Sequence, residues 1–483
     1  MKTIFEFSSP RREGFSWPIC DVPETDIRVA LGSEDNLRAD LPMPEVSEID
    51  VVRHFTRLSH LNYSVDTGFY PLGSCTMKYN PKINEKIASD PGLSEMHPLQ
   101  DESQCQGLLY ILYEMQLFLA QLAGMDVVTL QPAAGAQGEL TALMVFKRHL
   151  ERVGEEHRRI VIVPDSSHGT NPATAARCGF EIIKVPSGND GLVDIPSLSG
   201  MLNDDIAAMM LTNPNTLGLF EKQAAEISEM VHNCGALMYC DGANMNAILG
   251  IHRPGDAGFD AMHFNLHKTF AAPHGGGGPG SGPVAVKDFL SPYLPNPTVG
   301  FRNGRYFLDH NHPDSIGRVH SFYGNIGIIV RAYAYILSQG FIGLRSVSEH
   351  AVLNANYLLK KVKTAYDIPY GTRCMHEFVA SARKQKAHGV RALDIAKRLI
   401  DFGFHPPTIY FPLIVQEALM IEPTETESME TLDAFADALL TIAEEVESEP
   451  DVVLSAPHNT PVSRLDEAAA ARKPELTWSK DGV

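Results

Sequence analysis

The stretch NLHKTF, residues Asn265–Phe270, holds a lysine, Lys268, shortly before a glycine-rich run, Gly275–Gly282. Upstream, the stretch DGAN, Asp241–Asn244, closes an apolar run. Asp241 stands 27 residues before Lys268. An acid at the end of a predicted strand and a lysine between phenylalanines predict two buried charged groups. Such groups need partners, because burying an unpaired charge is costly.

This pair of residues fits one cofactor chemistry. The aldehyde of pyridoxal phosphate (PLP) needs an amine with which to form a Schiff base, and Lys268 would supply it. The pyridine nitrogen needs a carboxylate that keeps it protonated, and Asp241 would supply that. Side chains at i and i+2 of a strand point the same way, so Ala243 is expected to pack under the ring. The alternative for Asp241 is an acid that caps a turn. We interpret the pair as a PLP site.

A second motif, QPAAGAQGE (Gln131–Glu139), precedes a helical run that starts at Leu140. The small residues Ala134, Gly135 and Ala136 would let backbone N–H groups approach an anion at the N-terminus of that helix. The motif therefore predicts a cradle for the cofactor phosphate. A tight strand-to-helix turn without a ligand is the alternative.

Three further residues are candidate cofactor contacts. His168 follows the predicted strand Ile160–Val163, where an aromatic ring can stack on a planar cofactor; a loop histidine with a single hydrogen bond is the alternative. His267 could contact the phosphate or be purely structural. Asn215, in the stretch NPNT, could bond the ring hydroxyl, although a simple β-turn is the favoured explanation of this stretch.

The middle of the chain alternates apolar strand-like runs with helical stretches. Continuous apolar strands alternating with helices predict a mainly parallel sheet covered on both faces, in which ligands bind at the carboxyl ends of the strands. The predicted strands are Val127–Leu130, Ile160–Val163, Ile182–Val185, Ala207–Leu211, Leu237–Cys240, Met262–Asn265 and Val284–Val286, and the predicted helices include Gln104–Ala123, Glu139–Arg152, Ile195–Leu202 and Lys222–Asn233.

The sequence predicts an α/β protein in four parts. Residues 1–100 are rich in proline, glycine and polar residues and are expected to form an extended interface arm. Residues 101–325 would form the large PLP-binding domain. Residues 326–454, with a long helix broken near Gly340, would form a smaller α+β domain, and residues 455–483 a tail that docks on it.

Bulk composition limits the class of protein. The net charge is −19, with 40 basic and 59 acidic residues, which argues against nucleic acid as the main partner. Seven scattered cysteines without a metal-ligand pattern indicate reduced thiols, no metal site and a cytoplasmic location. The N-terminus lacks an apolar signal region, and no uninterrupted apolar run approaches the ~20 residues of a membrane span. We therefore expect neither a membrane nor a nucleic-acid partner.

Two weaker candidates are a loop and a set of arginines. The loop YPLGSCTMK, Tyr70–Lys78, carries a thiol, Cys75, without a base nearby in sequence, and we expect it to form a wall or an interface. Arginines can hold a substrate carboxylate in a bidentate manner, although a surface or interface role is the simpler expectation for each of them. They are Arg302, Arg305, Arg318 and Arg373.

With these motifs assembled, the chain resembles the glycine decarboxylase (P-protein) family of the glycine cleavage system. More narrowly, it is similar to subunit 2 of the split, two-subunit bacterial and archaeal form. The motifs span most of the chain: YPLGSCTMKYNP (Tyr70–Pro81), QPAAGAQGE (Gln131–Glu139), DSSHGTNPATA (Asp165–Ala175), YCDGANMN (Tyr239–Asn246), FNLHKTFAAPHGGGGPG (Phe264–Gly280) and Ser315–Gly324.

The resemblance implies a fold-type I PLP enzyme, a glycine dehydrogenase (aminomethyl-transferring, decarboxylating) of the oxidoreductase class. It implies that Lys268 carries the cofactor, that His168 stacks on its ring and that Asp241 holds its nitrogen. Glycine would be decarboxylated, and its aminomethyl group would pass to the lipoyl arm of H-protein. The resemblance also implies a heterotetramer with two copies each of this chain and of subunit 1.

Two other classes remain open at this point. One is another fold-type I PLP enzyme, an aminotransferase or a cysteine desulfurase, the latter also favouring a histidine directly before its lysine. The other is a non-catalytic subunit without cofactor, against which the joint presence of Lys268 and Asp241 argues.

Overall fold

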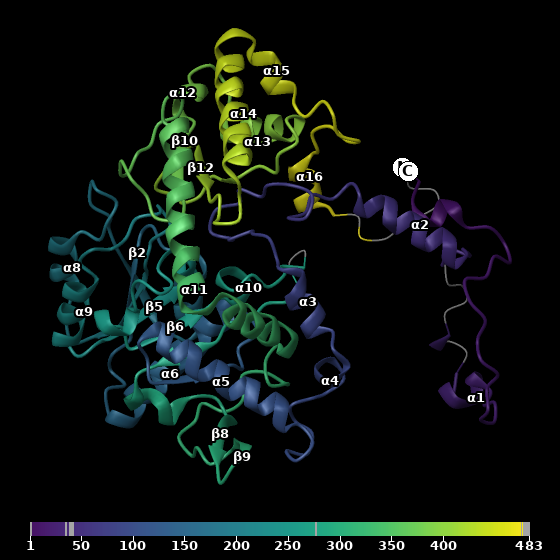
Figure 1. Cartoon of the computed structure of the whole chain (residues 1–483), viewed down its shortest axis with the longest axis horizontal. Coiled ribbons are helices and arrows are strands. Elements are labelled where there is room, and N and C mark those ends of the chain that lie inside the picture. Colours follow the sequence, from purple (N-terminus) through teal and green to yellow (C-terminus); the bar gives the residue numbers. More distant parts are fainter. Residues whose placement is uncertain (1, 34–35, 38–42, 276–277, 475, 477–483) are drawn as a thin grey trace. The chain divides into compact units, whose positions relative to one another are not determined.

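The computed structural model describes residues 2–33, 36–37, 43–275, 278–474 and 476. The chain divides into two compact units, Met1–Thr67 and Gly68–Val483. We call them the N-terminal unit and the main unit, and each is described by itself (Figure 1). The structure thus places residues 68–100, which we expected in the N-terminal arm, in the main unit. The four-part division of the chain stays a prediction.

The N-terminal unit contains three short helical elements, η1 (Ile4–Phe7), α1 (Ile27–Leu31) and α2 (Glu48–Ser59). The N-terminus of α2 is closed by a capping box, in which Ser47 and Asp50 each satisfy a backbone N–H of the other. Several large apolar side chains of this unit are exposed, Trp17 among them at 82%. Exposed apolar side chains along an extended segment suit a surface that another protein covers.

The main unit is built on a seven-stranded sheet whose order is β1-β7-β6-β5-β4-β2-β3. Only β7, among the described strands of this sheet, runs antiparallel to its neighbours, so the predicted mainly parallel sheet is confirmed. Each predicted strand is present within two residues at either end. The strands are β1 (Val127–Thr129), β2 (Ile160–Pro164), β3 (Glu181–Val185), β4 (Ile206–Thr212), β5 (Leu237–Gly242), β6 (Ala261–Phe264) and β7 (Val284–Val286).

Helices cover both faces of this sheet, because alternate strand residues point to opposite sides. On one face, Met209 and Met238 join a core cluster with α5 (Gln106–Ala123), α8 (Ile195–Met201) and α9 (Ala224–Asn233). On the other face, their strand neighbours Ala208 and Tyr239 join a cluster with α6 (Gly135–Val153) and α7 (Thr170–Arg177). The buried sheet thereby fixes where its strands end, and the candidate site lies at those ends.

A hairpin of β8 (Thr298–Arg302) and β9 (Arg305–Asp309) was missed by the sequence analysis. Its two-residue turn, Asn303–Gly304, has positive φ at both positions, 53° and 75°. Asn-Gly between apolar runs is the expected signal for such a turn, and it was present in the sequence.

The smaller part of the main unit begins with α11 (Ile326–Val362), the long green helix in Figure 1. A three-stranded antiparallel sheet follows, made of β10 (Phe378–Ser381), β12 (Ala418–Ile421) and β11 (Thr408–Ile409). The helices α13 (Ala392–Asp401) and α14 (Met429–Ser448) share one buried core with β10 and β12. The predicted α+β composition of this region is therefore present.

Among the described residues, α11 is long and apolar enough to meet a membrane-span criterion, with a window of mean hydropathy 1.4. Core helices of soluble proteins meet the same criterion. Gly340, at φ 58° and ψ −176°, interrupts the helix. The α11 residues Ile329 and Ala355, on either side of Gly340, lie in two different cores of the main unit. We regard α11 as weak evidence for a membrane, and the absence of a membrane partner stays a prediction.

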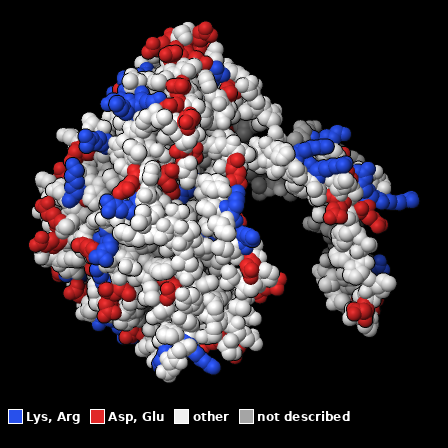
Figure 2. Space-filling model, in the orientation of Figure 1, with Lys and Arg blue, Asp and Glu red and all other residues white. Residues whose placement is uncertain are grey.

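The surface carries charges of both signs. Figure 2 shows acidic and basic side chains interspersed over one face of the main unit, with acidic ones gathered where α14 passes into α15 (Pro450–Ser455). A net charge far from zero favours solubility and does not by itself define a binding surface.

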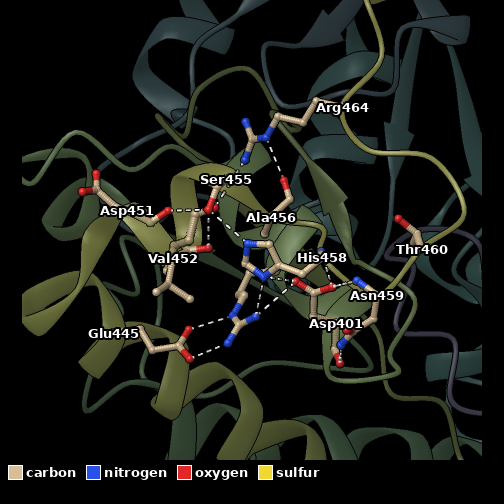
Figure 3. A network of polar contacts seen from close by, with 12 residues as sticks. Asp401, Glu445, Asp451, Val452, Ser455, Ala456, His458, Asn459, Thr460 and Arg464 are labelled. Carbon is tan, nitrogen blue, oxygen red and sulfur yellow. Dashed lines mark hydrogen bonds and ion pairs between the residues drawn. The ribbon is translucent and has the colours of Figure 1, made fainter.

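The segment after α15 is held against the smaller part of the main unit (Figure 3). Asp401 accepts hydrogen bonds from the backbone N–H groups of His458 (2.6 Å) and Asn459 (2.9 Å). Arg464 bonds the Asp394 carboxylate at 2.6 Å. These contacts dock residues 456–464, the first part of the segment for which we expected docking.

This network contains a serine, a histidine and an aspartate in the order of a hydrolase triad. Ser455 Oγ lies 3.0 Å from His458 Nε2, and His458 Nδ1 lies 3.2 Å from Asp401. However, Ser455 Oγ also bonds the Asp451 carbonyl at 2.6 Å, and Arg398 approaches His458 Nδ1 at 3.2 Å. An arginine N–H that donates to Nδ1 leaves the imidazole proton on Nε2, which cannot then accept a proton from the serine. We interpret this network as an anchor for the tail.

Candidate active site

A cavity of about 180 Å³ lies at the carboxyl ends of β4, β5 and β6. It brings together seven of the residues predicted to form the site: Lys268, Asp241, His168, Ala243, Gly135, Ala136 and His267. Its other lining residues are Ser74, Glu139, Thr170, Thr212, Thr216, Asn244, His263 and Asn265. This convergence is what the parallel sheet predicts, while the role of each residue stays a prediction.

Asp241 is the penultimate residue of β5 and is 2% exposed. Its two oxygens accept hydrogen bonds from Asn171 Nδ2 and from the backbone N–H of Ala243, each at 3.0 Å. Burial by itself raises the pKa of this carboxyl, but His263, these two hydrogen bonds and Lys268 outweigh burial and hold the pKa below its ordinary value. Asp241 is therefore an ionised carboxylate inside a buried pocket.

His263, which the sequence analysis missed, supports Asp241 from the neighbouring strand. The two residues are register partners on β5 and β6, and His263 Nε2 lies 3.6 Å from an Asp241 oxygen. The other ring nitrogen, Nδ1, lies 2.5 Å from the Tyr239 hydroxyl. Burial lowers the pKa of His263, and the nearby Asp241 acts in the opposite direction. The signal in the sequence that could have identified His263 was a histidine within the otherwise apolar strand AMHF.

Lys268 lies in a single helical turn, α10 (Leu266–Thr269), directly after β6. Its Nζ donates a hydrogen bond to the Ser74 carbonyl at 2.6 Å. The loop that contains Cys75 is thus a wall of the cavity, as predicted. Burial raises the pKa of the Cys75 thiol to about 11, so it is a neutral thiol and not a nucleophilic thiolate.

The N-terminus of α6 forms one wall of the cavity and has no side-chain cap. Ala134 is its N-cap residue and does not line the cavity, whereas Gly135 and Ala136 do. A Cβ on Gly282 would lie 2.0 Å from the Ala134 carbonyl oxygen, so glycine is required where the glycine-rich run crosses this turn. Uncapped N–H groups at a long helix suit an anion such as phosphate.

His267 lies beside this helix end. Its Nδ1 accepts a hydrogen bond from the Ser281 backbone N–H at 3.3 Å. Burial, His274 and Lys268 lower the pKa of His267 to about 3, so the ring is neutral. With Nδ1 as an acceptor, the proton stands on Nε2, which can donate to an anion in the cavity.

Glu139, one turn into α6, is a second residue that the sequence analysis missed. Burial and the nearby Asp241 raise its pKa to about 7. One of its oxygens accepts from Thr170 Oγ1 at 2.7 Å, and Thr170 Oγ1 lies 2.8 Å from His168 Nδ1. The other oxygen is buried and has no hydrogen-bond partner among the described residues.

Asn215 does not reach the cavity. Its amide oxygen accepts from the backbone N–H groups of Leu217 (3.0 Å) and Leu219 (3.1 Å), and its amide nitrogen donates to the Gly191 carbonyl at 2.9 Å. The side chain is therefore committed to holding its own loop. The turn alternative fits this position, and the adjacent Thr216 lines the cavity instead.

The candidate arginines lie elsewhere. Arg302, Arg305 and Arg318 line a separate surface hollow of about 1450 Å³ beside the β8–β9 hairpin. Arg373 is exposed and does not line the candidate site. The arrangement therefore gives no support to a bidentate hold on a substrate carboxylate by these four residues.

The cavity fits PLP by its donor set. A primary amine, an ionised carboxylate and an uncapped helix end match the aldehyde, ring nitrogen and phosphate of that molecule. Three buried oxygens of lining residues have no hydrogen-bond partner among the described residues and are left for a ligand: Glu139 Oε2, Thr212 Oγ1 and Asn244 Oδ1.

Solved structures show the same fold. The P-protein of the glycine cleavage system in inhibitor-bound form matches with a TM-score of 0.71, covering 88% of this chain and 100% of that chain at 20% identity. A cysteine desulfurase from Thermococcus onnurineus matches with a TM-score of 0.60 over 79% of this chain and 96% of that chain, at 14% identity. The chain thus has the fold of the fold-type I PLP enzymes.

Sequence relatives are much closer. A probable glycine dehydrogenase (decarboxylating) subunit 2 from Bacillus licheniformis is 58% identical over 99% of this chain and 98% of its own length. Its counterpart from Caldanaerobacter subterraneus is 56% identical over the same shares. Residues 22–306 match the family model for the glycine cleavage system P-protein, and residues 347–462 match that for the glycine dehydrogenase C-terminal domain. The chain belongs to the glycine cleavage system P-protein family, among the proteins named glycine dehydrogenase (decarboxylating) subunit 2.

Proposed function

We propose that this protein decarboxylates glycine and transfers the remaining aminomethyl group to the lipoyl arm of H-protein, as a glycine dehydrogenase (aminomethyl-transferring). The observation that carries the proposal is the convergence of Lys268 and Asp241 in one cavity of a P-protein family member. Those two groups are what the chemistry requires of a PLP enzyme.

The proposal assigns PLP to the cavity. Lys268 would hold its aldehyde, Asp241 its ring nitrogen, and the N-terminus of α6 with His267 its phosphate. His168 would lie on one ring face and Ala243 on the other. When bound, the cofactor supplies an electron sink that takes up the electron pair left behind by CO₂.

The protein's own groups keep this sink effective. Asn171 and the Ala243 N–H hold Asp241 ionised, so that it can keep a proton on a nitrogen placed against it. Lys268, once released from its covalent role, is an amine free to accept or return a proton. Its hydrogen bond to the Ser74 carbonyl keeps it facing the cavity.

Partners follow from the family name. Relatives are named subunit 2, and we propose that this chain assembles with subunit 1 as a heterotetramer containing two copies of each. Lipoylated H-protein would be the second protein partner. We propose a cytoplasmic location, since the cysteines are unpaired thiols in the structure.

The test is exchange of labelled CO₂ with glycine by the enzyme, assembled with subunit 1 and supplied with lipoylated H-protein. We expect exchange that depends on both glycine and H-protein. Sulfur release from cysteine, or amino-group transfer to a 2-oxo acid, in place of exchange would identify one of the other fold-type I chemistries. A colourless protein that binds no PLP would support a non-catalytic subunit.

The raised pKa of Glu139 leads to a prediction for stability. A carboxyl with a folded pKa of about 7 and an ordinary unfolded pKa destabilises the fold as pH rises between the two values. Glu139→Gln should therefore stabilise the apo-protein more at about pH 8 than at about pH 6, by about 1.4 kcal/mol. Urea unfolding at the two pH values measures the difference.

Glu151→Gln is the matched control for this prediction, because Glu151 is a more exposed glutamate on the same helix. We expect that variant to shift stability equally at both pH values. A Glu139→Gln effect that did not change with pH would show that this carboxyl is not held neutral by its surroundings.

A further inference from the structure

A buried cluster of two glutamates and a histidine lies next to the cavity, and the roles proposed so far do not include it. Its members are His376, Glu377 and Glu422, all 0% exposed, and ligand atoms from all three lie within 4.8 Å of one another. Glu377 directly precedes β10 and Glu422 directly follows β12. Because these strands pair antiparallel, with Phe378 opposite Ile421, the two carboxyl groups meet at the same end of the sheet.

The two glutamates hold one tight turn. Glu377 accepts from the Ser74 backbone N–H at 2.7 Å and from Ser74 Oγ at 3.4 Å. Glu422 accepts from the Thr76 backbone N–H at 2.9 Å and from Thr76 Oγ1 at 2.7 Å. Ser74 and Thr76 have φ values of 61° and 50°, which is costly, above all for a β-branched residue. Such strain is typical of functional sites.

Ser74 connects this cluster to the active site. It lines the cavity, and its carbonyl oxygen accepts the hydrogen bond from Lys268 Nζ at 2.6 Å. The hydroxyl of this cavity-lining residue lies 3.4 Å from a Glu377 oxygen. A single side chain therefore separates the cavity from a buried carboxyl group.

Ionisation of both Glu377 and Glu422 is unfavourable, because each carboxylate is buried and the two charges repel each other. Burial first, and then Glu422, raise the pKa of Glu377 well above its ordinary value, and burial raises that of Glu422. The histidine of the cluster adds no charge, since burial and Lys268 lower the pKa of His376 to about 3. Cys75 is a neutral thiol, and burial also lowers the pKa of His274. Lys268 lowers the pKa of both carboxyls, but burial outweighs it, and the pair retains a proton at neutral pH.

The proposed reaction needs a place to keep one proton. Glycine enters as a zwitterion with an ammonium group, and the products are CO₂, an aminomethyl thioether and a free thiol. The carbon–carboxylate bond and the disulfide bond break, and a carbon–sulfur bond forms. Glycine carbon is oxidised, the disulfide is reduced, and the electron pair of the disulfide bond leaves on the released sulfur. The proton on that sulfur balances the one that the ammonium loses in becoming an amine.

We propose that Glu377 keeps this proton and passes it through the Ser74 hydroxyl to the released lipoyl sulfur. In that step Glu377 gives its proton to Ser74 Oγ while the Ser74 hydroxyl proton moves to the sulfur. The proton that the glycine ammonium loses returns along the same path in reverse: it moves to Ser74 Oγ, and the Ser74 hydroxyl proton moves to Glu377. Glu422 stabilises the protonated form by its position. The inference rests on the proposed function.

Glu377→Gln tests the relay, since an amide oxygen can still accept from the Ser74 N–H but the side chain has no acidic proton to give. In the assembled enzyme we expect transfer to H-protein to fall about 100-fold in kcat with little change in the KM for glycine. In the wild type, kcat should fall as pH rises and the pair loses its proton, and the variant should lack that decline. Glu377→Asp, which restores an acid, should recover part of the rate.

Ser74→Ala is the second variant, because it removes the hydroxyl and leaves the carboxyl pair in place. We expect a loss of about 10-fold or more in kcat. Glu427→Gln is the matched control. Burial raises the pKa of Glu427 to about 7, and that residue does not line the cavity. It should leave both kcat and its pH dependence unchanged.

A spectroscopic readout separates the relay from the reaction itself. At about pH 8, above the pKa of about 7 of Glu139 and Glu427, the infrared spectrum should retain a protonated carboxyl band. Glu377→Gln should remove this band, and Glu427→Gln and Ser74→Ala should not. Absence of the band in the wild type, an unchanged pH profile in Glu377→Gln, or one equivalent of a metal ion holding both carboxylates ionised would each overturn the proposal. If wild-type enzyme shows no glycine-dependent exchange, the proposed function itself fails, whatever the infrared result.

Discussion

Lys268→Ala is expected to abolish turnover. The side chain is the amine in the cavity beside Asp241, and no other lysine lines that cavity among the described residues. Without it the cofactor has no covalent attachment, and the remaining contacts would hold it only reversibly. Borohydride reduction followed by peptide mass analysis should find a pyridoxyl group on the peptide that contains Lys268 in the wild type, and on none in the variant.

Lys268→Arg is the informative control for this experiment. A guanidinium keeps the positive charge and can still donate to the Ser74 carbonyl, but it does not form the covalent link. If Lys268 acts only by its charge or by anchoring the Ser74 turn, the arginine variant should regain activity. We expect it to stay inactive, with an unfolding midpoint close to that of the wild type. Normal turnover in either variant would refute the assignment of this residue.

Much of the large domain could be predicted from the sequence, because its signals are local. The strands carry continuous apolar runs, and Asp241 lies near the end of β5 while Lys268 lies in the helical turn that follows β6. In a parallel sheet the strand ends share one edge, so residues far apart in sequence can be placed together without knowing their contacts. The same reasoning placed His168 and the turn at Gly135 on that edge.

The parts that were missed depend on contacts between distant segments. His263 and Glu139 matter because register and packing bring them to Asp241, and neither stands at a recognisable motif position. Glu377 and Glu422 meet only when the small sheet pairs and the Ser74 turn crosses it. Asn215 is the opposite case. Its position in a loop after a strand suggested a cofactor contact, but the sequence does not reveal that the side chain bonds the backbone of its own loop.

Asp241→Asn is expected to keep the fold and some cofactor but to lose about 100-fold or more in kcat. An asparagine must place an NH₂ group where Asp241 now accepts a hydrogen bond, and Asn171 can accommodate it. The Asn171 oxygen is buried and has no hydrogen-bond partner among the described residues, so a flip of that amide would turn a donor into an acceptor. The local structure can therefore absorb the change at small cost in stability.

Asp241→Asn removes the negative charge of the carboxylate. A neutral amide does not stabilise a proton on a ring nitrogen as a carboxylate does, so the electron sink is weakened while binding contacts persist. We therefore expect a large fall in kcat, a small change in the KM for glycine, and an unfolding midpoint near that of the wild type. Steady-state exchange kinetics and thermal unfolding of the same preparation measure these effects. An unchanged kcat would remove the electronic role of Asp241, whereas loss of the folded state would assign this carboxylate to structure, because Asn171 would then have failed to compensate.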